Sequence, residues 1–241
     1  MAATGLYVTG TDTGVGKTAV AVAIAHALRG LGARVGVYKP VASGIARDDP
    51  AGDAARLWEA AGRPRGLGDV CPQAFAAAIS PPRSAAAEGR LVDEGLLRTG
   101  FQGWLEASDV VVVEGAGGLL SPLGTGTLNA DLARDLGLPL VVVDAARLGA
   151  IGRTLATVEA ARARGLSVAA VVLSHTDPPA GGPADPASPW AIARDSAEDL
   201  AGRLVPVPVT ALGHGGHVFE PPVDWRALAG RGQAASGHGR P

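Results

Sequence analysis

The chain has 241 residues, of which 47% are apolar and 18% charged, so it can build one large core and is too apolar to be disordered. Its net charge of −2 argues against a nucleic-acid or membrane-surface binder, and its single cysteine excludes a disulfide framework or a multi-cysteine metal site. No apolar stretch is long enough to span a bilayer and the N-terminus lacks a basic signal region, so we expect a cytoplasmic protein.

Short Val-rich runs alternate with helical stretches along the chain. The expected strands are Leu6–Thr9, Val35–Tyr38, Val110–Val113, Leu140–Val143, Val168–Leu173 and Val205–Val209. The expected helices are Lys17–Gly30, Asp53–Ala61, Val92–Ala107, Leu128–Asp135, Ile151–Arg164 and Ala191–Arg203. This alternation predicts an α/β fold with a doubly wound, mostly parallel sheet flanked by helices, and ligands bind at the carboxyl ends of such strands. We expect residues 1–231 to form a single domain and residues 232–241 to be a disordered tail.

The first motif is GTDTGVGKT at Gly10–Thr18, which follows an expected strand and opens an expected helix. This context is typical of a P-loop, in which backbone N–H groups and the helix N-terminus hold phosphate oxygens. Lys17 would reach the β- and γ-phosphates, and the Thr18 hydroxyl would bind Mg²⁺. Because the leading glycine stands one position early, the loop is one residue longer than the usual pattern. The alternative is a glycine-rich turn that binds nothing.

The second motif is YKPVASG at Tyr38–Gly44, at the end of the second expected strand. Lys39 and Lys17 are the chain's only lysines among 21 basic residues, which indicates positions where a compact ammonium is needed. Beside a nucleotide, Lys39 would stabilise charge on a transferred phosphoryl group or orient an acidic co-substrate. Ser43 adds a hydroxyl. The alternative is a solvated lysine at the end of a strand.

Two acidic residues complete the pattern. In DVVVVEGAGG, an apolar strand ends at Glu114, where a P-loop enzyme places the acid on its Mg²⁺ side. The alternative is a solvated glutamate before a tight turn. Asp53 opens an expected helix, and by itself it is better interpreted as a helix cap. A loop at residues 214–222 lies near the expected strand ends, where it is placed to cover a nucleotide.

Five motifs together resemble the dethiobiotin synthetase family. They are GTDTGVGKT, YKPVASG, ISPPRSAAAEG, VVVVEGAGG and VDAARLGAIG, in this order, and the resemblance runs from about residue 5 to about residue 180, more weakly to about 210. It implies a P-loop NTPase fold and an ATP- and Mg²⁺-dependent ligase. The ligase would join CO₂ to 7,8-diaminononanoate as a carbamate, phosphorylate it to a carbamic–phosphoric anhydride, and close the ureido ring of dethiobiotin.

The resemblance also implies roles for individual residues. Lys17 and Lys39 would be the catalytic residues. The nucleotide would contact Thr13, Gly14, Val15, Gly16, Lys17, Thr18 and Ser174. Mg²⁺ would be held by Thr18, Asp53 and Glu114. The diamine would contact Thr13, Lys39, Ser43, Ser80, Pro81, Gly117, Gly118, Leu148 and Gly149. The family is homodimeric, and the segment Leu148–Ala150 resembles the part that meets the substrate tail at the subunit interface.

Two departures from the family pattern leave questions open. Gly152 stands where the family often has an asparagine that holds the substrate carboxylate, and Arg153 beside it is a candidate replacement. Ser174 stands where an asparagine typically reads the adenine base, so the preference for a base stays open.

Two other readings compete with this one. A P-loop amidoligase of the cobyrinic acid diamide type normally carries a glutaminase domain, for which this chain is too short. A switch-type P-loop ATPase that positions partners would carry an early lysine in the loop, where this chain has Thr11, Asp12 and Thr13.

Overall fold

The structure is a computed structural model that describes residues 4–45, 52–178 and 188–230. The expected disordered tail at 232–241 lies outside these residues. Seven strands form one sheet in the order β2-β5-β1-β6-β7-β8-β9, parallel throughout except for β9, which is antiparallel to β8. Their bounds are β1 Gly5–Gly10, β2 Val35–Tyr38, β5 Val110–Gly118, β6 Leu140–Ala145, β7 Val168–Ser174, β8 Val209–Leu212 and β9 Phe219–Glu220. The expected doubly wound, mostly parallel sheet is therefore confirmed.

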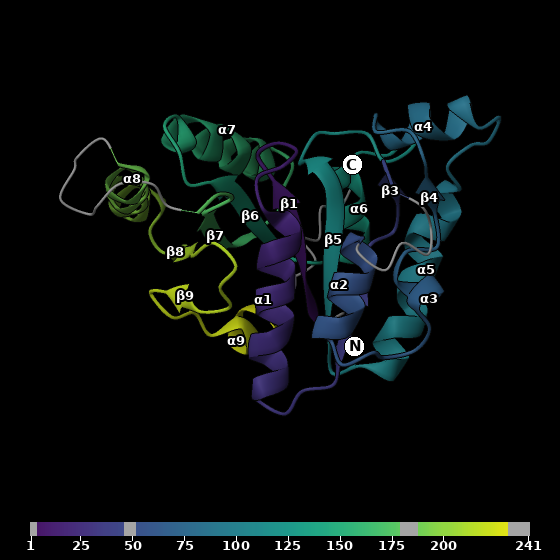
Figure 1. The fold of residues 1–241 in the computed structure, drawn as a ribbon, viewed down its shortest axis with the longest axis horizontal. Coiled ribbons are helices and arrows are strands. Elements are labelled where there is room, and N and C mark those ends of the chain that lie inside the picture. Colours follow the sequence, from purple (N-terminus) through teal and green to yellow (C-terminus); the bar gives the residue numbers. More distant parts are fainter. Residues whose placement is uncertain (1–3, 46–51, 179–187, 231–241) are drawn as a thin grey trace, which may run out of the picture.

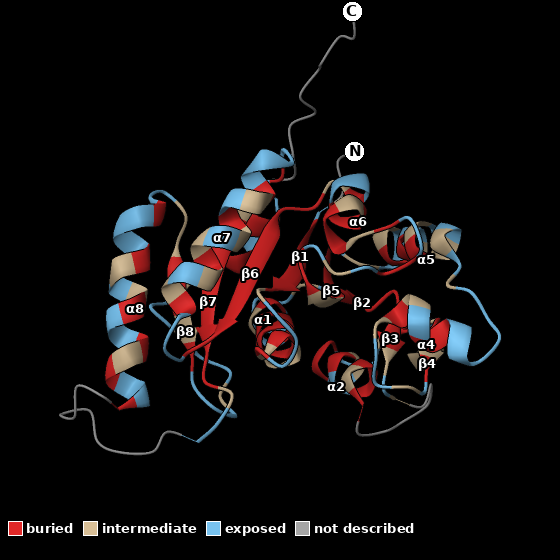
Figure 2. Ribbon diagram, turned by 90° about the horizontal axis from the view of Figure 1, so that it is seen from above, coloured by how far each residue is buried: buried red, intermediate tan, exposed pale blue. Residues whose placement is uncertain are grey.

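Helices cover both faces of this sheet (Figures 1 and 2). The helices α1 (Lys17–Gly30) and α9 (Trp225–Ala229) pack together on one face, and α2 (Asp53–Ala60) lies beside α1 near β2. The helices α5 (Glu94–Ala107), α6 (Asn129–Leu136), α7 (Ala150–Ala163) and α8 (Pro189–Leu204) cover the other face. Strands β1 and β6 are buried along their whole length, as nearly continuous apolar runs between two helical layers should be.

The predicted strand at Val205–Val209 is wrong in its bounds, because β8 begins only at Val209. Pro206 and Pro208 have no N–H to donate, so this stretch cannot pair as an inner strand. The carbonyl of Pro208 instead accepts a hydrogen bond from Val171 N at 2.9 Å and leads the chain into register.

Several short elements were not predicted, because two to seven residues carry too little periodicity. They are β3 (Ala42–Ser43) and β4 (Ala74–Phe75), which form a small parallel sheet of their own, together with α3 (Leu67–Val70), α4 (Pro81–Ala87), β9 and α9. The strand expected at Val110–Val113 continues through the glycines to Gly118, which pairs with Gly10. The glycine run is thus part of the sheet and not a turn after it.

The strand order decides where ligands can bind. From β1 the chain crosses to β2 and β5 on one side and then to β6, β7 and β8 on the other. Such a reversal opens a crevice beyond the carboxyl ends of the central strands. The P-loop, the YKPVASG segment and the end of β5 all reach this edge of the sheet.

Candidate active site

The predicted P-loop forms the turn between β1 and α1, and its glycines are required by geometry. Gly16 has φ 90°, and a Cβ there would lie 2.3 Å from Ser174 Oγ. A Cβ at Gly10 would meet the Asp12 carbonyl at 2.6 Å. The buried Lys17 ammonium donates to this same carbonyl at 2.9 Å. Burial lowers the pKa of Lys17. The negative charge of Glu114 acts in the opposite direction, and the positive charge of Lys39 lowers the pKa further.

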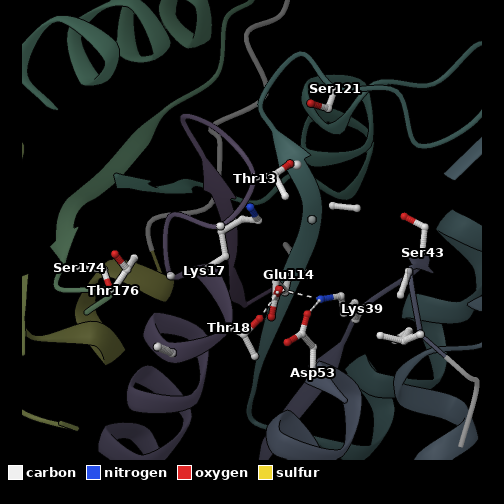
Figure 3. A pocket seen from close by; sticks show the side chains of 18 of the residues that line it. Thr13, Lys17, Thr18, Lys39, Ser43, Asp53, Glu114, Ser121, Ser174 and Thr176 are labelled. Carbon is white, nitrogen blue, oxygen red and sulfur yellow. Dashed lines mark hydrogen bonds and ion pairs between the residues drawn. The ribbon is translucent and has the colours of Figure 1, made fainter. Parts of the chain in front are cut away.

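An ionic cluster of the buried Lys39 and Glu114 with the half-buried Asp53 lies beside the P-loop (Figure 3). Lys39 follows β2, Asp53 begins α2, and Glu114 belongs to β5. The Lys39 ammonium donates to Glu114 Oε1 at 2.8 Å and to Asp53 Oδ2. The Thr18 hydroxyl, from α1, donates to the same Glu114 oxygen at 2.9 Å. Four separate segments therefore deliver one cation, two carboxylates and a hydroxyl to one point.

The charges of this cluster stabilise one another. Burial alone would lower the pKa of Lys39, but the charges of Glu114 and Asp53 outweigh it and raise the pKa. Burial alone would raise the pKa of Asp53, but the ion pair with Lys39 outweighs it and lowers the pKa. Glu114 is 1% exposed, and its Oε2 has no hydrogen-bond partner among the described residues. A buried oxygen of this kind is costly unless a ligand takes it up.

The interpretation of Asp53 as a helix cap is wrong. Gly52 is the N-cap residue of α2, and the Asp53 carboxylate points to Lys39. The local sequence favoured the cap, because the partner of Asp53 comes from a different strand end, and it was the family resemblance that grouped Asp53 with Thr18 and Glu114. Ser80 stands at the N-cap of α4, and prolines fill the first turn of that helix.

A cleft of about 920 Å³ opens above the P-loop and the ionic cluster. Thirteen of the predicted site residues line it: Thr13, Gly14, Gly16, Lys17, Thr18, Lys39, Ser43, Asp53, Ser80, Pro81, Glu114, Gly117 and Ser174. Ser174 and Thr176 lie to one side of Lys17, and Ser43 lies to the other (Figure 3). The cleft therefore extends to both sides of Lys17.

Four predicted site residues do not line this cleft. Val15 is fully buried beneath the loop, and Gly118 is buried with its N–H bonded to Ser121 Oγ at 3.0 Å. Leu148 is 82% exposed, and Gly149 is the N-cap residue of α7. The segment at 148–149 therefore lies on the surface of the chain, away from the cleft lining.

Other residues line the cleft without having been predicted. They are Ala19, Ala42, Ile45, Arg56, Ala78, Ile79, Gly115, Ala116, Ser121, Pro122, His175, Thr176, Gly213, His214 and Gly215. One sequence signal could have found Arg56, because it stands three positions after Asp53 on the same face of α2. The loop that holds Gly213–Gly215 overlaps the segment expected near the nucleotide, although nothing in its composition shows how closely it approaches.

The described residues contain no group of three or more His, Cys, Asp or Glu side chains that could hold a metal ion. A cation site here would therefore have to combine two carboxylates with a hydroxyl, as the set Thr18, Asp53 and Glu114 does. No helix within the described ranges has the length and apolarity needed to cross a membrane.

A parallel sheet with a P-loop after its first strand, and an acid on the neighbouring strand β5, defines a P-loop nucleotide-dependent protein. The family model described as an AAA domain matches residues 4–212. The ATP-dependent dethiobiotin synthetase of Rhodopirellula baltica is 45% identical over 185 residues, covering 71% of this chain and 72% of the relative. The enzyme of the same name from Anaeromyxobacter sp. (strain Fw109-5) is 43% identical over 206 residues, covering 84% and 90%. The chain belongs to the ATP-dependent dethiobiotin synthetase family.

Proposed function

We propose that this protein is a ligase that forms the ureido ring of dethiobiotin from 7,8-diaminononanoate, CO₂ and MgATP. The observation that carries the proposal is the meeting of the chain's only two lysines with Asp53 and Glu114 in one cleft. The names of its relatives agree with this reaction and favour neither an amidoligase of the cobyrinic acid diamide type nor a switch-type ATPase.

The reaction demands positive charge, because the carbamate and the triphosphate are both anions that must approach each other. Lys17 lies in the P-loop, where its ammonium donates to the Asp12 carbonyl and would turn to phosphate oxygens when a nucleotide binds. Lys39 lies at the centre of the cleft, where its ammonium can stabilise the charge that develops between carbamate and γ-phosphate. Holding the two anions together supplies much of what a phosphoryl transfer needs.

The residues present fit a magnesium ion. Thr18, Asp53 and Glu114 would hold it, since oxygen ligands are what Mg²⁺ prefers and Glu114 Oε2 is buried without a partner in the described part of the chain. When bound, Mg²⁺ supplies neutralisation of phosphate charge. Lys39 forms ion pairs with Asp53 and Glu114 and thereby neutralises the charge of both carboxylates.

The two ends of the cleft suggest which substrate binds where. Ser43, Ser80 and Pro81 line the end beyond Lys39, which we assign to the diamine together with Gly117, which lies beside Thr13 of the P-loop. Ser174, Thr176 and the Gly213–Gly215 loop line the end beyond Lys17, which we assign to the nucleotide base. A serine hydroxyl cannot present the paired donor and acceptor of an asparagine amide, so ATP, CTP and GTP should be compared directly.

We also propose a homodimer that acts in the cytoplasm, where ATP is available. Leu148 exposes 82% of its surface just before α7, in the segment where the family resemblance implies a contact between subunits. Such a contact would bring the segment at 148–150 to the tail of a diamine bound in the partner's cleft. Sedimentation of the wild type and of Leu148→Glu tests this, since the charged variant should shift toward monomer.

Phosphate release tests the reaction itself. Purified protein with MgATP should release phosphate only when both 7,8-diaminononanoate and bicarbonate are present, and mass spectrometry should find dethiobiotin. Release that ignores the diamine but responds to a protein or lipid would favour a switch-type ATPase. No release with ATP, CTP or GTP would contradict the proposal.

A further inference from the structure

A second buried carboxylate stands at the same edge of the sheet, outside the cleft. Asp144, in β6, is 0% exposed, and both of its oxygens are bonded. Oδ1 accepts hydrogen bonds from Thr11 Oγ1 at 2.7 Å and from Ala145 N at 2.8 Å. Arg153 Nε lies 3.1 Å from each oxygen, and Thr154 Oγ1 lies 3.4 Å from Oδ2. None of the roles assigned above uses this residue.

Asp144 reaches the P-loop through Thr11. Thr11 is the first residue after β1, and its N–H also donates to Val143 O at 2.9 Å, so β6 holds Thr11 at both its backbone and its side chain. The next residue, Asp12, supplies the carbonyl that holds the Lys17 ammonium. A displacement of Thr11 would therefore move the partner of the phosphate-binding lysine.

Asp144 reaches the start of α7 through Arg153. The Arg153 side chain donates from Nη1 to Leu148 O at 3.3 Å, and the same nitrogen would lie 2.9 Å from a Cβ at Gly149. The guanidinium thus supports the turn that presents residues 148–149. Its Nε is bonded to Asp144, while its Nη2 is buried without a hydrogen-bond partner among the described residues, so a role for Arg153 in place of the family's asparagine at position 152 stays a hypothesis.

We propose that Asp144 is a positioning residue that joins the P-loop to the segment at residues 148–149, so that the nucleotide loop and the start of α7 hold one geometry. An apolar side chain would fill this buried place at a lower desolvation cost, so the charge has to be explained by what it orients. The proposal adds a positioning residue to the proposed function. Its expected effect on the diamine rests on that function, whereas its expected effect on nucleotide binding depends on the P-loop alone.

The test removes one arm of the network at a time. Thr11→Val deletes the hydroxyl that bonds to Asp144 and keeps the shape of the side chain. We expect it to weaken binding of a non-hydrolysable MgATP analogue by about 10-fold, as measured by calorimetry, because one hydrogen bond to a charged group orients the loop. Thr11→Ser restores the hydroxyl and should restore the affinity. These measurements need no ligase activity, so they are independent of the proposed reaction.

Thr127→Val is the matched control. Its buried hydroxyl donates to a carboxylate oxygen of Glu94 at the start of α5, so the variant loses a hydrogen bond of the same kind, and neither residue lines the cleft. Both variants should lower the melting temperature, but only Thr11→Val should change nucleotide affinity. Equal affinity in both variants would overturn the proposal, since Thr11 would then contribute stability alone.

Arg153→Leu tests the other arm. We expect it to raise the KM for the diamine several-fold with a smaller change in kcat, and to weaken nucleotide binding less than Thr11→Val does. In the double variant the two losses of nucleotide affinity should not multiply, because both act through one carboxylate. Strictly multiplicative losses would show two independent contacts and would overturn the coupling.

Discussion

Glu114 and Asp144 are both fully buried carboxylates at the carboxyl edge of the sheet, yet they are satisfied differently. Both oxygens of Asp144 are bonded by groups of the chain itself. Glu114 places Lys39 and Thr18 on one oxygen and leaves the other without a partner in the described residues. A carboxylate that faces a cleft with one oxygen unpartnered is available to a ligand. A carboxylate whose two oxygens are both hydrogen-bonded within the chain instead orients the structure around it.

The largest loss of activity is expected from substitution of Lys39, the cation of the ionic cluster. Lys39→Ala should reduce turnover by about 100- to 1,000-fold, because an oriented charge at the reacting centre is lost. Binding of a nucleotide analogue should change little. Lys39→Arg should also be poor, since a planar guanidinium does not fit where a compact ammonium contacts two carboxylates. Product formation followed by mass spectrometry checks both variants, and intact turnover in Lys39→Ala would contradict the role.

Substitution of Lys17 should instead act on nucleotide binding, which substitution of Lys39 leaves nearly unchanged. Lys17→Ala should weaken nucleotide binding by about 10- to 100-fold or more, because a charged donor to the phosphates is lost in a buried loop. Calorimetry with a MgATP analogue measures this directly. An affinity equal to that of the wild type would show that the ammonium stays on the Asp12 carbonyl and does not reach the phosphates.

Binding of a metal ion in the absence of nucleotide tests whether the unpartnered oxygen of Glu114 is available to a ligand. In the structure the Lys39 ammonium contacts both carboxylates that would bind a cation, so Lys39→Met should bind Mn²⁺ about 10-fold more tightly than the wild type without nucleotide. Electron paramagnetic resonance follows free Mn²⁺. Adding Glu114→Gln to this variant should remove the gain, and a gain that persists would place the metal elsewhere.

The smallest effect is expected at Glu94, a carboxylate outside both clusters. The Thr127 hydroxyl and the Gly126 N–H bond to it and lower its pKa. Because the folded pKa lies below the unfolded value, its contribution to stability is present above the unfolded pKa of about 4.3 and is lost as pH falls through the folded pKa. Between about pH 5 and pH 3, the melting temperature of the wild type should therefore fall more than that of Glu94→Gln. Identical slopes would contradict this linkage.

Local patterns were sufficient for much of this protein. The Val-rich runs predicted five of the seven strands of the main sheet, although β5 extends beyond its prediction, and prolines displaced a sixth, β8, from its predicted place. The motif at Gly10–Thr18 predicted the P-loop because its glycines, lysine and threonine are neighbours in the chain, as the backbone geometry of such a loop requires. Lys39 and Glu114 could be singled out because each closes an apolar run. Such signals depend on short separations along the chain.

Only the tertiary structure decided which of these residues meet. Asp53 is an ordinary helix-opening residue until β2 brings Lys39 to its carboxylate, and Asp144 is an unremarked strand residue until Thr11 and Arg153 converge on it. These pairs span up to 133 positions, and no periodicity links their members. Burial then determines what each contact is worth, because charges removed from water must find partners in the fold or in a ligand. The sequence by itself determined the residue types and the place of most strands, and the order of the strands decided the chemistry that those residues can perform together.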